Sequence, residues 1–309
     1  MKLLIAHDGS ECADAALNDL LHAGLPSTAE VVVLSVGELT SELSNVTALA
    51  ASTGYYFPDD PSVMALNEHR LADAQASATQ AAKRLQRDFP TWTITTEAVL
   101  DTAETAIVQS ATDWKPDLIA VGSHGRSGFR RFFLGSVSQH VLKHTHCSVR
   151  IGRSHRHPHD QPIRLLLGID GSPDATAALQ TIAARKWPSG TQVRVVGVLD
   201  YRSWLLPAAT EISESALAPV MEEELRSRAS ETIRQAVRDL KASDISASPE
   251  ILAGNPGHVL VAEAERWDAD CIFVGARGLN ALERIFLGSV STTVAMQAHC
   301  SVEVVRQPA

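Results

Sequence analysis

The sequence has few cysteines and no long hydrophobic run. Its 309 residues include four cysteines, and no two of them form a CxxC pair. This usage is typical of a reducing compartment. No apolar stretch reaches the roughly 18–20 residues that a transmembrane helix needs. The apolar start, MKLLIAHDGS, is too short for the core of a signal peptide and predicts a buried strand. We therefore expect a cytoplasmic protein.

Positive charge is also scarce. The chain has 27 Lys and Arg against 36 Asp and Glu, which gives a formal net charge of −9. A binder of nucleic acid or of membrane surfaces would present a basic face, so we expect neither partner. An anionic ligand is not excluded, because backbone amides at a helix N-terminus can hold phosphate without any net positive charge.

The sequence is built from two copies of one pattern. KLLIAHDGS near the start returns as RLLLGIDGS, so that Asp8 matches Asp170 at a spacing of 162 residues. FLGSVS at 133–138 returns unchanged at 286–291, at a spacing of 153 residues. The first copy must therefore hold nine more residues, and the polar stretch 40–61 is the expected place of a surface insertion.

The two copies are separated by a polar segment. Residues 154–162, SHRHPHDQP, contain two prolines, three histidines and no apolar residue, which is typical of an exposed linker. We expect one domain at 1–153, this linker at 154–162, and a second domain at 163–309. The three histidines of the linker, and the trio His144, His146 and Cys147, are interpreted as solvent-exposed and helix-end residues and not as metal ligands.

Apolar periodicity predicts alternating strands and helices in each copy. The expected strands are 2–7, 31–36, 93–100, 118–121 and 148–151, then 165–169, 193–198, 246–252, 271–274 and 301–305. The expected helices are 11–23, 64–89, 105–114 and 136–144, then 175–185, 220–241, 257–267 and 289–298. This order predicts an α/β fold: two copies of a doubly wound, Rossmann-like domain with a five-stranded parallel sheet. Ligands of such sheets bind beyond the carboxyl ends of the strands, where the winding reverses.

A glycine-rich loop follows the fourth strand of each copy. The loops are GSHGRSGFRRFFLGS at 122–136 and GARGLNALERIFLGS at 275–289. Glycine lets a phosphate come within hydrogen-bonding distance of main-chain N–H groups, and the last Gly-Ser of each loop opens a helix whose free amides favour an anion. Neither the GxxxxGK[ST] loop nor the GxGxxG fingerprint occurs, which argues against P-loop hydrolysis and NAD chemistry. The alternative interpretation is turn geometry alone.

These motifs resemble those of the universal stress protein family, and the resemblance covers the chain twice. ATP-binding members carry G-x2-G-x9-G-[ST], an early strand that ends in Asp, and a closing Cys-x-Val strand. The matching residues are Asp8, Gly122, Gly125, Gly135, Ser136 and Cys147 in the first copy, and Asp170, Gly275, Gly278, Gly288, Ser289 and Cys300 in the second.

The resemblance implies an adenine nucleotide alpha hydrolase-like fold with ATP at each switch point. Whether Mg²⁺ is shared with the phosphates is left open. The phosphates would lie on the amides that continue through Val137 and Val290, and Val36 and Val198 would line the adenine. Asp8 and Asp170 would accept hydrogen bonds from the nucleoside, although both also suit a turn or a helix cap. The resemblance further implies that the two halves pair within the chain.

The two copies differ in detail, so equal affinity is not expected. The family's Gly-Asn/Asp-Pro turn is kept at residues 254–256, but residues 100–102 read Leu-Asp-Thr. No general base with a nucleophile partner recurs in both copies. We therefore expect a nucleotide-binding protein of stress response or signalling that acts on an unknown protein partner, with further homodimerisation open. A slow ATPase or phosphotransfer enzyme and a scaffold with empty sites are the alternatives.

Overall fold

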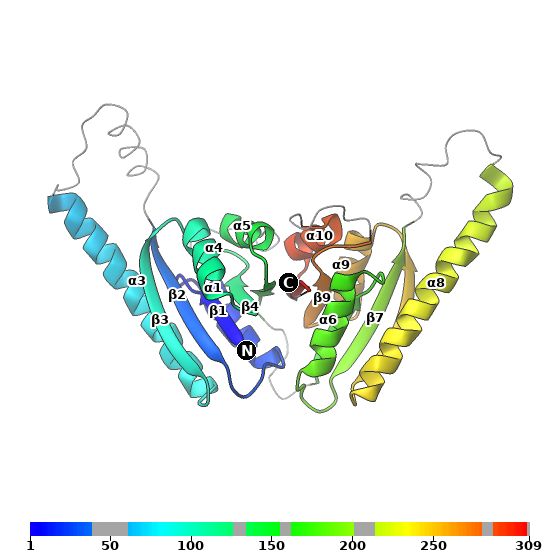
Figure 1. Ribbon diagram of the computed structural model, residues 1–309, viewed down its shortest axis with the longest axis horizontal. Coiled ribbons are helices and arrows are strands. Elements are labelled where there is room, and N and C mark those ends of the chain that lie inside the picture. The colour runs from blue at the N-terminus through cyan, green and yellow to red at the C-terminus, as the bar shows by residue number, and fades with distance from the viewer. Residues whose placement is uncertain (39–60, 126–133, 155–161, 201–213, 280–286, 308–309) are drawn as a thin grey trace.

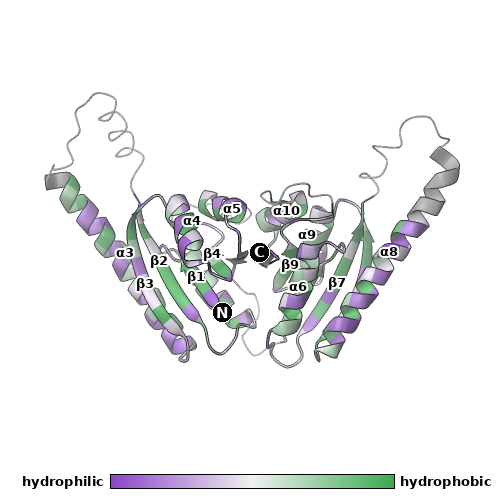
Figure 2. Cartoon of the chain, viewed as in Figure 1, coloured by the Kyte–Doolittle hydropathy of each residue, from purple (hydrophilic) through white to green (hydrophobic). Residues whose placement is uncertain are grey.

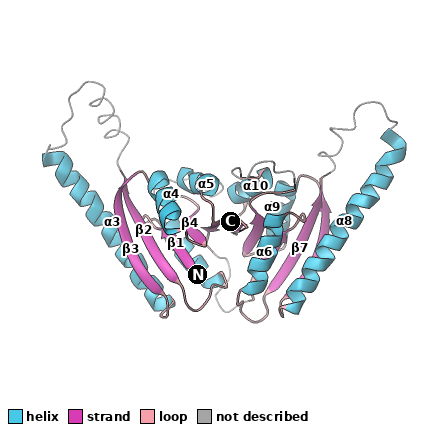
Figure 3. Cartoon of the chain, in the orientation of Figure 1, coloured by secondary structure: helices cyan, strands magenta, loops and turns pink. Residues whose placement is uncertain are grey.

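Strands and helices alternate along the whole chain. The structure, a computed structural model, describes residues 1–38, 61–125, 134–154, 162–200, 214–279 and 287–307, and of 61–62 and 214–222 the backbone alone. The first half contains β1 (Lys2–Ala6), α1 (Glu11–Asp19), the 3-10 helix η1 (Leu20–His22), β2 (Glu30–Glu38), α3 (Pro61–Asp88), β3 (Thr93–Asp101), α4 (Ala103–Trp114), β4 (Leu118–Gly122), α5 (Ser136–His144) and β5 (Ser148–Gly152). Figure 3 shows this alternation.

The second half repeats the same order. It contains β6 (Arg164–Gly168), α6 (Pro173–Ala184), β7 (Gln192–Leu199), α8 (Glu214–Ala242), β8 (Ser246–Ala253), α9 (Pro256–Arg266), β9 (Cys271–Gly275), α10 (Ser289–Gln297) and β10 (Ser301–Val305). Every predicted element is present and of the predicted type. The expected insertion at 40–61 lies between β2 and α3, almost entirely outside the described residues, as does most of the linker.

The ten strands of the described residues form a single sheet. Its order is β3-β2-β1-β4-β5-β10-β9-β6-β7-β8, and every neighbouring pair is parallel except β5 and β10. Each half is thus a five-stranded parallel sheet wound in both directions from its first strand, which confirms the predicted fold class. The two halves meet edge to edge in the middle of the molecule, with α3 and α8 on the outer flanks (Figure 1).

Helices cover both faces of the sheet, and this explains the composition of the strands. The strands β4 and β9 are buried over almost their whole length, as expected when parallel strands are covered on both sides. On one face α4 packs on α5 and α9 on α10; on the other α1 packs on α3 and α6 on α8. Figure 2 shows hydrophobic residues along the strands and hydrophilic ones on the outer sides of α3 and α8.

The apolar core is shared on one face and divided on the other. One cluster runs through both halves, from Leu4 and Ile119 across Val149 and Val302 to Val274. Two separate clusters lie on the opposite face, one under α1 and α3 and one under α6 and α8. The junction therefore joins the halves by continuous apolar packing on a single face. Among the described residues, no helix has the length and apolar character required to cross a membrane.

Candidate nucleotide site

The predicted site lies where the winding of each half reverses. In the first half β1 lies between β2 and β4, and the chain leaves β1 toward α1 on one face and leaves β4 toward α5 on the other. The same arrangement is found for β6, β7 and β9 in the second half. The turn after the first strand and the glycine loop after the fourth therefore meet at one edge of the sheet.

Asp8 and Asp170 each hold the turn that follows the first strand. The Ser10 amide donates to Asp8 Oδ1 at 2.9 Å, and the Ser172 amide donates to Asp170 Oδ1 at the same distance. The intervening glycine of each turn has a positive φ, +84° at Gly171, which a residue with a Cβ rarely adopts. The turn role that the sequence left open is thus present in both halves.

The second oxygen of each aspartate faces the glycine loop. A Cβ on Gly125 would lie 3.2 Å from Asp8 Oδ2, and one on Gly278 would lie 2.9 Å from Asp170 Oδ2. In the second half the Leu279 amide also donates to Asp170 Oδ2 at 3.3 Å. Each aspartate therefore connects the first turn to the loop, and a side chain at the second glycine would be forced against a carboxylate.

The first glycine of each loop is required by packing. A Cβ on Gly122 would lie 2.8 Å from the carbonyl oxygen of Cys12, and one on Gly275 would lie 2.6 Å from the amide nitrogen of Ala175. These atoms belong to the first turns of α1 and α6. Glycine here lets the helix start lie directly on the strand end, a reason that is independent of any ligand.

The last glycine of each loop opens a helix without a side-chain cap. Gly135 and Gly288 are the N-caps of α5 and α10, and in neither helix does a side chain of the N-cap residue accept from the first amides. In contrast, α1, α4, α6 and α9 are each capped by a Ser, Thr or Asn side chain. The Gly135 and Gly288 amides donate to carbonyls of their own loops at 2.7 Å, so the following amides are the ones that face outward.

The surroundings of these two helix starts differ. The Ser136 hydroxyl donates to Glu104 Oε1 at 3.1 Å, whereas the residue equivalent to Glu104 is Gly257. The loop position between the two first glycines also differs, because His124 is equivalent to Arg277. Two hydrogen bonds, of 2.7 and 2.9 Å, join the Arg277 guanidinium to the buried carboxylate of Asp174. The first site thus carries the additional carboxylate of Glu104, and the cation of the second site is already paired.

The imidazole of His124 lies beside the first loop. Its Nδ1 is 3.2 Å from the Ser123 hydroxyl. Burial first, and then the positive charge of Arg153, lowers the pKa of His124 below its ordinary value. The neutral form is therefore favoured, which weakens any role as a cation for phosphate. The cationic residues at 126–133 and 280–286 lie outside the described residues.

A buried histidine behind the first site was missed by the sequence analysis. His7 Nδ1 is 3.1 Å from the Ser77 hydroxyl and accepts a hydrogen bond from the Gly9 amide at 3.3 Å. His7 Nε2 lies 3.4 Å from Asp14 Oδ1, which also binds Arg84 at 3.0 Å. Burial is the main reason that the pKa of His7 is lowered. The indication was present in the sequence, since a histidine stands where the second copy has Ile169.

The predicted adenine-lining valines lie near the ends of the neighbouring strands. Val36 and Val198 are half-buried near the carboxyl ends of β2 and β7, and both pack against the shared core. They stand one strand away from the aspartates, on the side opposite the glycine loops. Contact with adenine stays a prediction. The described residues contain no group of three or more His, Cys, Asp or Glu side chains that could hold a metal ion.

Comparison of this chain with known proteins finds the same repeat and the same fold. The model of the universal stress protein family matches residues 1–153 and again 163–306. The chain belongs to the universal stress protein family. Universal stress protein Rv2005c of Mycobacterium tuberculosis is 28% identical over 234 residues, 75% of each chain. Universal stress protein Sll1388 of Synechocystis is 29% identical over 151 residues, which cover 46% of this chain and 97% of that protein.

A solved structure supports the tandem arrangement of this family member. The crystal structure of a universal stress protein from Archaeoglobus fulgidus matches with a TM-score of 0.64 and 20% identity, over 99% of this chain and 98% of that one. At this identity the likeness concerns the fold alone. It covers both halves together, so the two-domain Rossmann-like architecture is that of a tandem universal stress protein.

Proposed function

We propose that this universal stress protein binds ATP at two sites, one in each of the domains 1–153 and 163–309. The observation that carries the proposal is the pair of uncapped helix starts at Gly135 and Gly288, in contrast to α1, α4, α6 and α9, which are capped by side chains. The amides of Ser136 and Val137, and of Ser289 and Val290, would supply hydrogen bonds and the positive end of the helix dipole to the phosphates.

The remaining site residues fit a nucleoside. In Asp8 and Asp170, one carboxylate oxygen accepts the amide of the turn and the other faces the glycine loop. There the second oxygen can accept a hydrogen bond from a ribose hydroxyl. Val36 and Val198 would contact the adenine with apolar surface. Mg²⁺, when bound with ATP, would neutralise phosphate charge, and the nearby carboxylates are the type of ligand that it takes.

The proposed role is nucleotide-dependent binding in the cytoplasm, in stress response or signalling, toward a protein partner. In the described loop residues 122–125 and 275–279, no general base recurs in both halves, because His124 and Arg277 occupy equivalent positions. Catalysis by acid–base chemistry needs such a base in place. A slow ATPase is the second candidate, favoured only by His124 beside the first loop.

The helix-amide proposal is tested by removing one amide at each site. Gly135 has φ −64° and ψ 158°, and Gly288 has φ −67° and ψ 155°, which are angles that a residue before proline adopts. Ser136→Pro and Ser289→Pro therefore remove the first helical N–H while preserving the helix. We expect each change to weaken ATP binding at its own site by roughly 10- to 100-fold in calorimetric titration, because a hydrogen bond to a charged group is lost.

Ser136→Ala and Ser289→Ala are the matched controls, since they remove only the hydroxyl. Proline variants that bind ATP as tightly as the alanine variants would contradict the amide cradle. Absence of titration heat in the nucleotide-stripped chain, together with no nucleotide released when the purified chain is denatured, would favour the scaffold interpretation. Phosphate release in a single turnover that Gly135→Ala or Gly288→Ala abolishes would favour the ATPase.

A further inference from the structure

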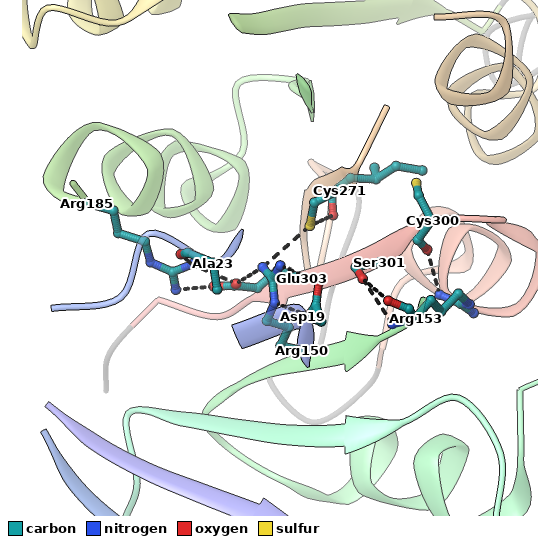
Figure 4. Close-up of polar contacts among 10 residues, drawn as sticks. Asp19, Ala23, Arg150, Arg153, Arg185, Cys271, Cys300, Ser301 and Glu303 are labelled. Carbon is teal, nitrogen blue, oxygen red and sulfur yellow. Dashed lines mark hydrogen bonds and ion pairs between the residues drawn. The ribbon is translucent and has the colours of Figure 1, made fainter. Parts of the chain in front are cut away.

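The junction between the halves places equivalent residues face to face. In the antiparallel pair of β5 and β10, Arg150 is directly opposite Glu303, and these residues are also equivalent in the repeat. The local two-fold axis therefore passes between them. Val149 and Ile151, which flank Arg150 in β5, belong to the shared core. Because side chains alternate along a strand, Arg150 points to the opposite face of the sheet. Figure 4 shows the group of charges that it meets there.

Four buried charges of alternating sign cross the junction. Arg150 donates from Nε to Asp19 Oδ2 at 2.6 Å and from Nη2 to Asp19 Oδ1 at 2.9 Å. Its remaining Nη1 donates across the junction to Glu303 Oε2 at 3.0 Å, with Cys271 Sγ at 3.5 Å. Arg185 completes the series by binding both oxygens of Glu303, with 2.8 Å between Nη1 and Oε2.

Each half contributes one cation and one carboxylate to this group, but Nη1 of Arg150 finds its carboxylate partner only in the other half. Asp19, Arg150 and Glu303 have side chains at most 1% exposed, and the side chain of Arg185 is 10% exposed. Burial works to lower the pKa of Arg150, yet the charges of Asp19 and Glu303 raise it well above the ordinary value. Asp19 uses Nε and Nη2 of Arg150, so Nη1 depends on Glu303 for its carboxylate partner.

The shapes of the two sides are also unlike. Arg185 donates to the carbonyl of Ala23 at 3.0 Å, and Ala23 is the residue equivalent to Arg185 in the first copy. Beside it, a Cβ on Gly24 would lie 2.9 Å from the ring of Trp187. Small residues of the first half thus receive large residues of the second. A pair of two second halves would place the large residues against each other, and a pair of two first halves would leave a space.

Other contacts of the junction are the same from both sides. Arg153 donates to the carbonyl of Ala295, at the C-terminal end of α10, and also to that of Cys300, directly before β10. Its equivalent Arg306 donates to the carbonyl of Leu142, at the C-terminal end of α5. Free carbonyls at a helix C-terminus favour a cation, so these two contacts stabilise the junction. Because the contacts to Ala295 and Leu142 are reciprocal, they would form equally in any pairing of halves.

We propose that the junction is selective for its partner: the β5 edge pairs with the β10 edge of a second half and does not pair with another β5 edge. Two first halves would bring the Nη1 atoms of two Arg150 side chains together with no acceptor between them. Two second halves would bring two Glu303 carboxylates together across the axis. Both arrangements bury like charges, which is a recognised way of excluding wrong partners. The partner is therefore an unlike half, from the same chain or from a second copy.

The experiment uses the whole chain, cut after folding. A protease site is placed within residues 155–161, and the folded protein is cleaved there so that the tether no longer dictates pairing. Unlabelled and ¹⁵N-labelled cleaved protein are mixed, in the lowest urea concentration at which exchange of halves between them is complete. Native mass spectrometry then counts unlike and like pairs. We expect like pairs at fewer than about one in a hundred, since like-charge contacts are strongly disfavoured.

Neutralising the charges should weaken the selectivity for unlike pairs. The combined variant Asp19→Leu, Arg150→Met, Arg185→Met and Glu303→Leu removes all four charges, and the milder variant Asp19→Asn, Arg150→Gln, Arg185→Gln and Glu303→Gln removes them while keeping polar side chains of similar size. We expect like pairs to rise at least tenfold in either, toward about half of all pairs if selectivity is lost. The control Arg153→Ala with Arg306→Ala should speed exchange but leave the proportion of like pairs unchanged.

The outcomes distinguish selective pairing of the halves from a general loss of stability at the junction. Like pairs near statistical abundance in the unsubstituted cleaved chain would overturn the proposal, whatever the variants do. It would also be overturned if the milder variant folds and still excludes like pairs. A rise of like pairs in the Arg153 and Arg306 control, equal to that in the neutral variants, would show that general weakening explains the result.

Discussion

Single residues explain why the two halves are not equivalent, and His7 is the clearest case. It is 5% exposed and stands where the second half has Ile169. Its Nδ1 accepts the amide of Gly9, the glycine that follows Asp8, so the neutral imidazole helps to fix the turn of the first site. The charges that face it are Asp14 and Asp8, which favour protonation, and Arg84, which opposes it. Burial outweighs the two carboxylates.

The lowered pKa of His7 predicts a dependence of stability on pH. Because the folded-state pKa lies below the unfolded value of 6.5, the unfolded chain binds the proton first as the pH falls. The contribution of His7 is therefore complete above the unfolded pKa and is lost as the pH drops below it toward the folded pKa. In urea unfolding at pH 5 to 7.5, we expect His7→Gln to show a shallower fall in free energy of unfolding than the unsubstituted chain. Parallel curves would contradict this.

Elements are positioned by their ends as much as by their apolar faces. Four helix starts are capped by the side chains of Ser10, Thr102, Ser172 and Asn255. The family turn at residues 254–256 supplies one of these caps, and in the first half Thr102 supplies it without that turn. Helix α4 is therefore capped even though the first copy lacks the Gly-Asn/Asp-Pro turn. The helices that follow the glycine loops lack a side-chain cap, and the proposed phosphate site uses their first amides.

The caps of α1 and α6 differ in one respect that can be measured. Ser10 Oγ accepts the Ala13 amide, while Ser172 Oγ accepts the Ala175 amide and also donates to the carbonyl of Arg277 at 3.1 Å. Ser10→Ala should cost about 1 kcal/mol of stability, as lost caps do. Ser172→Ala should cost about 2 kcal/mol, because a further hydrogen bond is removed. Denaturant unfolding of both variants checks this, and equal losses would count against the contact between the turn and the loop.

At the scale of the whole molecule, the halves are joined by one sheet and one core. The β5 and β10 strands connect two parallel sheets through their only antiparallel pair within the described residues. Apolar packing on one face and four buried charges on the other hold this junction. We expect the halves to unfold together for this reason, although each has its own apolar cluster on the face of α1 or α6.

Calorimetry tests this coupling. The unsubstituted chain should show one thermal transition. Arg150→Met should lower stability by about 3–5 kcal/mol, because it leaves Asp19 and Glu303 buried without their shared partner. Arg84→Met is the matched control: its partner Asp14 is 50% exposed at the side chain, so a loss below about 1 kcal/mol is expected. Two resolved transitions in the unsubstituted chain, or equal losses in the two variants, would contradict the coupling.

The sequence by itself determined the repeat, the order and type of every element, and the family. These follow from local periodicity, from capping residues and from glycines at fixed spacing, all of which act over a few neighbouring positions. What only the tertiary structure decided was which side chains meet across long distances. Nothing in the strand SVRIG indicates that Arg150 would be buried between Asp19 and Glu303, more than a hundred residues from each. A charge can enter a sheet's interior only where the fold brings it a partner, and that partner is not visible in the local pattern.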